Sequence, residues 1–158
     1  MSSRFLPVVL AVLTASSSFM AAADVPNFTG EWKMNNAKSN FGPMPAPDVM
    51  TRSINHNDPS LEITTHQKGA RGELTSELKY TTDGKPAVNK VRGSDAKGTA
   101  RWEGQTLVIE SWLEVPGGEI KGKETWALSG GGKTLTIRNH TSIPQQGEFD
   151  TTWVLEKQ

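Results

Sequence analysis

Residues 119–155 read EIKGKETWALSGGGKTLTIRNHTSIPQQGEFDTTWVL, and the fold class follows from this stretch. Three runs rich in Thr, Ile, Val or Trp are separated by Gly130–Gly132 and by Pro144–Gly147. β-branched and aromatic residues favour strands, whereas clustered Gly and Pro favour turns. In the last run, every second residue from Phe149 to Leu155 belongs to one more apolar face, as in a half-buried strand. The stretch therefore predicts three consecutive antiparallel strands.

The same pattern of short runs and turn residues continues back to Asp24. It predicts further strands at 28–34, 50–56, 61–67, 73–81, 87–92, 98–102 and 106–114. Turns are predicted at 57–60 and 103–104, and Asp83-Gly84 predicts a tight hairpin. Short links require antiparallel neighbours, because a parallel crossover needs a dozen or more residues. We therefore expect an all-β chain of about eight to ten strands with no substantial helix.

Closure of such a meander into an up-and-down barrel removes the exposed edge strands. A barrel of about eight or more strands has room inside for one small ligand. The alternative is an immunoglobulin-like sandwich, whose crossing links must be longer, and only residues 35–48 could supply one. The prolines of that segment exclude a regular helix or a central strand. It fits either a loop over the barrel mouth or a cover for a sheet edge.

The first 23 residues have the layout of a secretory signal peptide. Arg4 precedes the apolar run Phe5–Leu13, and Ala21–Ala23 supply the small residues of a cleavage site. The run is too short to span a bilayer, and no later run is longer. We expect cleavage after Ala23, a single barrel domain at 24–158, export to the periplasm or the medium, and no membrane insertion.

The composition excludes several function classes. The chain has 17 basic and 17 acidic residues, so its charge offers no basis for nucleic-acid binding. It has no cysteine, which excludes disulfides, thiol catalysis, Cys-based zinc sites and a lipid anchor on Cys.

Residues 27–33 read NFTGEWK and place Gly30 and Trp32 as Gly-x-Trp on the first predicted strand. This resembles the lipocalin signature and, more loosely, the start of the fatty-acid-binding proteins of the same calycin group. In those families the Trp plugs the closed end of the barrel, and an Arg from a late strand packs across it. The resemblance therefore implies a lipocalin-like barrel in which Arg138 contacts Trp32. The continuation through Lys38–Pro43 resembles a group of small exported bacterial proteins.

Two features of the fatty-acid-binding proteins do not carry over. Those proteins have two short helices after the first strand, for which residues 35–48 are too few and too rich in proline. They also clamp a carboxylate with Arg and Tyr, two residues apart on the last strand, where Trp153 and Leu155 stand here.

No motif for catalysis or metal binding stands out in the sequence. Gly132-Lys133-Thr134 resembles the end of a phosphate-binding loop, but Ala127 replaces the leading glycine and strands are predicted on both sides. His56, His66 and His140 are the minimum for a three-His zinc site, yet a turn near 58–59 would put His66 beyond the level of His56. No Gly-x-Ser-x-Gly elbow is present. The sequence thus indicates no catalytic residue, no metal site and no cofactor.

The five tryptophans make a ligand pocket the favoured hypothesis. Large apolar residues on predicted strands are the candidate wall residues: Trp102, Trp112, Trp126, Ile137 and Phe149. We expect a non-enzymatic protein that holds a small apolar or amphipathic molecule. Two alternatives stay open: a ligand-free module of the cell envelope that exposes Trp112 in a surface patch, and a barrel enzyme with an inward histidine beside a carboxylate of perturbed pKa.

Overall fold

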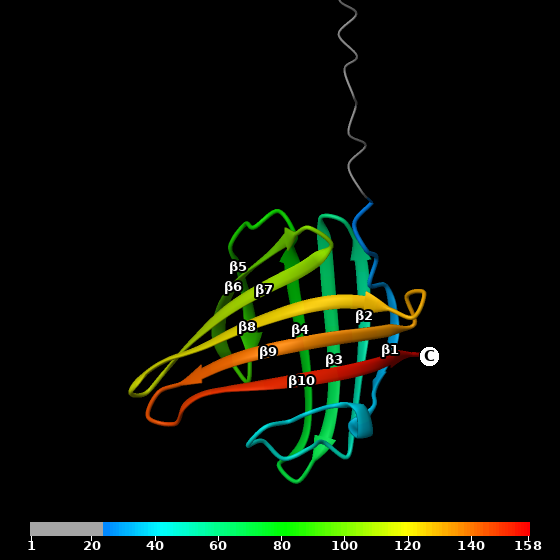
Figure 1. Cartoon of the computed structure of the whole chain (residues 1–158). Coiled ribbons are helices and arrows are strands. Elements are labelled where there is room, and N and C mark those ends of the chain that lie inside the picture. Colours follow the sequence, from blue (N-terminus) through cyan, green and yellow to red (C-terminus); the bar gives the residue numbers. More distant parts are fainter. Residues whose placement is uncertain (1–23) are drawn as a thin grey trace, which may run out of the picture.

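A computed structural model describes residues 24–158, so the predicted signal peptide lies outside the described residues. Ten strands wind into a barrel (Figure 1). Their bounds are β1 Gly30–Met34, β2 Val49–Asn57, β3 Ser60–Gly69, β4 Gly72–Thr81, β5 Ala87–Val91, β6 Ser94–Glu103, β7 Thr106–Val115, β8 Gly118–Ser129, β9 Thr134–Ile143 and β10 Gly147–Lys157. In this part of the chain the helical structure is a single 3₁₀ turn, η1 at Asn36–Lys38, and no helix is long and apolar enough to cross a membrane.

All ten strands belong to one antiparallel sheet, which confirms the predicted all-β fold. The strand order is β4-β3-β2-β1-β10-β9-β8-β7-β6-β5. Consecutive strands are therefore hydrogen-bonded to each other except β4 and β5, and β1 also pairs with β10. Trp32 on β1 pairs with Lys157 on β10, which joins the first strand to the last. A single continuous sheet excludes the sandwich alternative and agrees with an up-and-down barrel.

The barrel is not closed by a backbone ladder at every point. β4 and β5 are the two edges of the sheet and lie side by side without pairing. The Asn89 side chain on β5 bridges this seam: its Nδ2 donates to the Lys79 carbonyl oxygen at 3.1 Å, and its Oδ1 accepts the Lys79 N–H at 2.7 Å. One buried amide thus takes the place of a paired strand residue.

The tight hairpin predicted at Asp83-Gly84 is wrong because the chain turns there without pairing β4 to β5. The Gly84 N–H instead donates to the Ala100 carbonyl oxygen on β6 at 2.8 Å. Asp83 accepts bonds from the Thr81 hydroxyl and the Lys85 N–H, which stabilise an open turn. Pro86, directly before β5, has no N–H to donate to a ladder.

The Gly-x-Trp signature has a physical basis in the contact between β1 and β10. Gly30 has a φ of +146°, a backbone conformation that favours glycine, and a Cβ there would lie 2.6 Å from Lys157 Cε and displace the end of this lysine. Lys157 Nζ then lies 5.4 Å from the centroid of the buried Trp32 ring. The expected contact between Arg138 and Trp32 is therefore wrong, and Lys157 takes its place. Arg138 is exposed on β9 and alternates with the buried Ile137 and Asn139, so it points outward.

Asn89 generates a prediction about the seam. Replacing Asn89 by Ala leaves the Lys79 N–H and carbonyl without these partners in a partly buried seam. We expect the free energy of unfolding, measured by urea denaturation, to fall by about 1–3 kcal/mol. Val88→Ala on the same strand is the control, because Val88 is 63% exposed and its loss should cost little. Equal effects of the two substitutions would contradict the bridging role of Asn89.

Candidate ligand cavity

One end of the barrel encloses a cavity of about 470 Å³. Most of its lining is apolar and includes Met34, Met50, Leu78, Leu113, Ile120 and Phe149. Phe41 and Met44–Pro47, from the segment between β1 and β2, complete the lining, so this segment lies at the barrel mouth. The Asp48 N–H donates to the Lys68 carbonyl oxygen at 2.8 Å, which fixes the segment beside the β3–β4 turn (Figure 1).

The predicted wall residues divide between the two ends of the barrel. Trp112 and Phe149 line the cavity. Trp126 and Ile137 are fully buried in the core, and Trp102 packs against that core. These three side chains lie at the closed end, below the cavity.

Sequence reasoning missed other apolar residues of the cavity wall, such as Met50, Leu78 and Leu113. Each lies on the inward alternation of a strand that it correctly placed. Their distance from the closed end depends on strand register, and a strand pattern does not contain that information. For Met50 the sequence offered one signal: it lies two residues after the proline-rich segment 35–48, which was predicted as a possible loop over the barrel mouth.

Polar side chains form the floor of the cavity. Glu124 on β8 and Asn139 on β9 are directly opposed in the sheet, and both line the cavity. Arg52 on β2 points into the barrel between Met50 and Ile54, and its Nη1 lies 3.8 Å from Glu124 Oε2. The Arg52 guanidinium also lies over two indole rings, 5.4 Å from the Trp126 centroid and 5.2 Å from the Trp153 centroid. This floor separates the cavity from the packed core.

The floor also includes a neutral phenol. Burial raises the pKa of Tyr80 to about 12, and the nearby Glu124 carboxylate shifts it in the same direction. Tyr80 lines the cavity and stays protonated at any physiological pH. It therefore offers a hydroxyl group to the interior without adding charge.

The closed end is plugged by the segment that precedes β1. The Phe28 ring stacks on Trp102 at 5.9 Å and meets Trp126 edge-on at 5.4 Å. The Phe28 N–H donates to His56 Nδ1 at 3.3 Å, and the Phe28 carbonyl oxygen accepts the Trp32 indole N–H at 2.8 Å. Both backbone groups of Phe28 are thus paired, which holds its ring in the barrel end.

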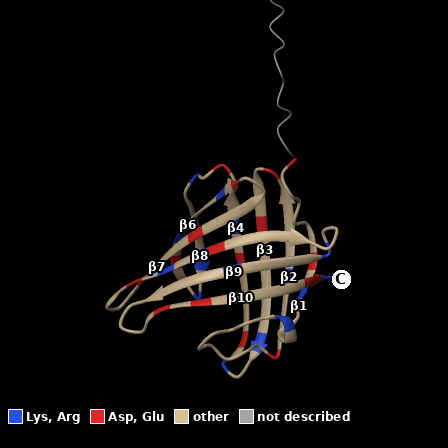
Figure 2. Cartoon of the chain, viewed as in Figure 1, with Lys and Arg blue, Asp and Glu red and all other residues tan. Residues whose placement is uncertain are grey.

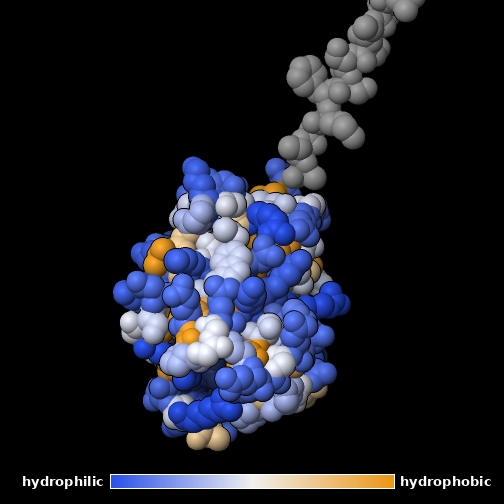
Figure 3. Space-filling model, turned by 90° about the vertical axis from the view of Figure 1, so that its left-hand side faces the viewer, coloured by the Kyte–Doolittle hydropathy of each residue, from blue (hydrophilic) through white to orange (hydrophobic). Residues whose placement is uncertain are grey.

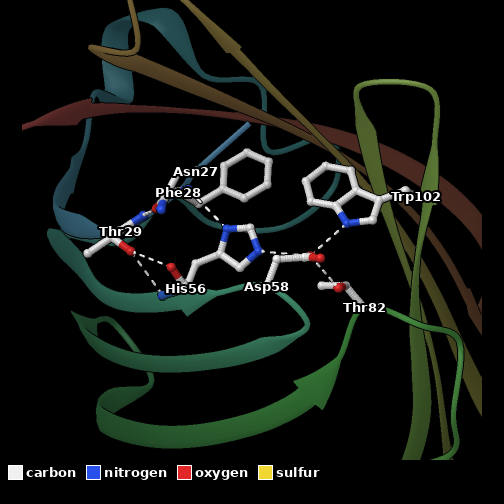
Figure 4. Close-up of polar contacts among 7 residues, drawn as sticks. All are labelled: Asn27, Phe28, Thr29, His56, Asp58, Thr82 and Trp102. Carbon is white, nitrogen blue, oxygen red and sulfur yellow. Dashed lines mark hydrogen bonds and ion pairs between the residues drawn. The ribbon is translucent and has the colours of Figure 1, made fainter. Parts of the chain in front are cut away.

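Asp58 joins this plug to the neighbouring strands (Figure 4). Its Oδ1 lies 3.4 Å from His56 Nε2 and accepts bonds from the Thr82 hydroxyl at 2.5 Å and the Trp102 indole at 2.9 Å. The bond from Thr82 is the largest cause that lowers the Asp58 pKa below its ordinary value, and the Trp102 and His56 bonds act in the same direction. The carboxylate therefore links β2, β6 and the end of β4.

His56 and Asp58 have the arrangement expected of a barrel enzyme, namely an inward histidine beside a carboxylate of perturbed pKa. Their hydrogen bonds, however, oppose a catalytic role. The His56 side chain is only 1% exposed, and each ring nitrogen already faces a partner, Nδ1 the Phe28 N–H and Nε2 the Asp58 carboxylate. No ring nitrogen is left to take a proton from a substrate. The other histidines are exposed on the outer surface, with His66 bonded to Thr75 and His140 to Asp150. Within residues 24–158 no three His, Asp or Glu side chains gather as metal ligands.

The outer surface carries charges of both signs, interspersed along the strands in the view of Figure 2. In the view of Figure 3, hydrophobic residues occur as isolated spots on a mainly hydrophilic face. The exposed large hydrophobic residues of the described chain are three valines, Val25, Val49 and Val88. Single exposed valines are ordinary features of a protein surface.

Comparison with solved structures places this barrel among proteins of the same architecture. A zebrafish ileal bile acid-binding protein complexed with cholic acid has a TM-score of 0.58 and 20% identity, covering 83% of this chain and 98% of the other. Caenorhabditis elegans lipid binding protein 8 has a TM-score of 0.60 and 12% identity, covering 83% and 95%. Secretory abundant heat soluble protein 4 from Ramazzottius varieornatus has a TM-score of 0.57 and 12% identity, covering 83% and 94%.

Neither known protein-family models nor curated protein sequences give a match to this chain. At the identities above, the structural likeness establishes the fold. The chain therefore forms a ten-stranded barrel of the calycin type.

The Asp58 network generates a prediction about pH. A carboxyl group with a lowered pKa in the folded state stabilises the fold above its ordinary value, and that stabilisation is lost as the pH falls through the lowered pKa. We therefore expect Asp58→Asn to reduce the free energy of unfolding at pH 7. The difference from wild type should shrink as the pH falls below the ordinary value of 3.8.

Urea denaturation followed by tryptophan fluorescence across this pH range is the measurement. Asp95→Asn is the matched control, because Asp95 is an exposed carboxylate paired only with Lys90. A stability difference for Asp58→Asn that stays constant down to low pH would contradict the role given to the carboxylate.

Proposed function

We propose that the protein binds a small, largely apolar molecule in the barrel cavity and performs no chemistry on it. The observation that carries this proposal is the cavity of about 470 Å³, lined mainly by apolar side chains and closed below by a few polar ones. Small-molecule sites commonly have volumes of roughly 300–1,000 Å³, apolar walls and a few placed polar groups. The names of two similar barrels, a bile acid-binding protein and a lipid binding protein, support the proposal.

The surface of residues 24–158 favours a ligand over a surface partner. A ligand-free module would expose Trp112 in an apolar patch, but this indole is half-buried and its cross-strand neighbours are Lys97 and Lys121. The exposed valines lie on separate segments, namely before β1, on β2 and on β5. A hollow interior is also difficult to explain in a purely structural module, because unfilled apolar space forfeits packing energy.

A cavity-filling substitution tests the proposal. Leu113→Trp places a larger side chain in the cavity, and we expect it to weaken binding of the neutral fluorescent probe N-phenyl-1-naphthylamine by about tenfold or more. The wild-type protein should bind the probe saturably with a stoichiometry near one. Probe emission in a titration measures both quantities.

Val88→Trp is the control for this titration, because it adds the same side chain at a position that is 63% exposed. Circular dichroism checks that both variants fold. Absence of saturable binding by the wild type, together with no co-purified small molecule in native mass spectrometry, would overturn the proposed function.

We also propose that the protein is exported, which the Arg4 and Phe5–Leu13 pattern supports. Expression of the full chain in a bacterium should yield a protein in the periplasm or the medium that begins at Asp24. Intact-mass measurement and N-terminal sequencing of each cell fraction test this. Replacing Leu10 by Arg should block processing, because a charge interrupts the apolar run. A processed Leu10→Arg chain would count against a signal peptide.

A further inference from the structure

A buried cation with unused hydrogen-bond donors lies directly behind the cavity lining, beside the lining residues Glu124 and Trp153. The Arg52 side chain is 6% exposed, and its Nε and Nη1 find no hydrogen-bond partner among residues 24–158. Two indole rings and the Glu124 carboxylate at 3.8 Å stabilise its charge but leave those N–H groups unpaired. An unpaired buried donor is costly, so a polar group that reaches the guanidinium beside Glu124, at the edge of the cavity, would gain these donors as partners.

Glu124 and Asn139 complete a set of donors and acceptors at the same level. Asn139 Nδ2 is also buried without a partner in the described chain. Glu124 Oε2 accepts the Trp126 indole N–H at 2.7 Å, and the half-buried carboxylate lines the cavity. A visiting polar group would therefore meet N–H donors from Arg52 and Asn139 and an acceptor from Glu124.

The charges of this floor decide which polar group fits. Arg52 and Glu124 neutralise each other, so a ligand carboxylate would place a second negative charge beside Glu124 in a poorly hydrated site. A ligand ammonium would likewise face Arg52. Like charges brought together in such surroundings repel each other strongly. A hydroxyl group instead accepts a bond from Arg52 or Asn139 and donates one to Glu124, which satisfies both kinds of partner.

We propose that the ligand is an uncharged amphiphile whose polar end carries a hydroxyl group, held on the floor by Arg52, Asn139 and Glu124. This inference rests on the proposed function. The apolar part of the ligand then extends toward the mouth along Met50, Leu78, Leu113 and Phe149. Head-group charge, rather than chain length, is the property by which this cavity selects.

Three amphiphiles with the same chain test the inference: 1-dodecanol, dodecanoate and dodecylammonium. Each displaces N-phenyl-1-naphthylamine from the wild-type protein at pH 7.5, and the displacement curves give the dissociation constants. We expect 1-dodecanol to bind about tenfold or more tightly than either ion. Dodecanoate or dodecylammonium binding as tightly as 1-dodecanol would overturn the inference.

Charge variants test the residues involved. In Glu124→Gln, Arg52 is no longer neutralised, and we expect dodecanoate to become the tightest of the three ligands. In Arg52→Gln, Glu124 is unopposed, and dodecylammonium should become the tightest. Asp95→Asn removes a carboxylate from the outer surface and should leave the order of the three ligands unchanged. An order that stays the same in all three variants would overturn the assignment of the floor.

The double variant Arg52→Gln/Glu124→Gln guards against misfolding of the single variants, because it removes both buried charges together. It should still bind the probe but bind 1-dodecanol about tenfold or more weakly, since hydrogen bonds to charged groups are lost. An unchanged 1-dodecanol affinity would overturn the inference. Probe binding with no head-group preference in the wild type would overturn the inference alone, whereas no binding of the probe or of any amphiphile would overturn the proposed function as well.

Discussion

A ten-stranded barrel encloses a wider interior than its inward side chains can fill, and the position of the filling determines the rest of this structure. Phe28 and the indoles of Trp102 and Trp126 fill the end at which the chain enters the barrel. The plug depends on hydrogen bonds to both backbone groups of Phe28, from the Trp32 indole and to His56. With one end filled, the free volume collects at the other end, beneath the proline-rich segment.

The polar floor between these two halves is better explained by the cavity than by stability. A buried ion pair seldom stabilises a fold more than apolar side chains of similar volume would. Arg52 occupies a position between Met50 and Ile54 where an apolar residue would continue the core. The Trp126 and Trp153 rings offset part of the cost of burying its charge without using its N–H groups. The arrangement keeps a polar surface within an otherwise apolar interior.

The sequence predicts the strands well because their signals are local. Turn residues bound every strand, and alternation identifies an inward face, as it does for Phe149–Leu155 on β10. The same alternation puts Arg52 between Met50 and Ile54 on the apolar face of β2. This pattern indicates a buried cation, which the sequence analysis did not identify. The distance of a side chain from either end of the barrel depends on strand register and not on the local sequence. The sequence therefore predicts Trp126 and Ile137 as cavity wall residues, whereas both lie in the core below the cavity. The Lys157 contact with Trp32 and the β4–β5 seam depend on partners distant in sequence, which residue patterns do not specify.

The pairing of β1 with β10 has a consequence for biogenesis. Residues 32–34 find their partners at 155–157, more than a hundred residues further along the chain. Hairpins β2–β3 and β7–β8 can form earlier from local contacts, but the sheet cannot join β1 to a partner on its second side until β10 has been synthesised. A nascent chain that lacks β10 therefore exposes an unpaired edge on β1. Closure of the barrel is a late, long-range step that follows the formation of the local hairpins.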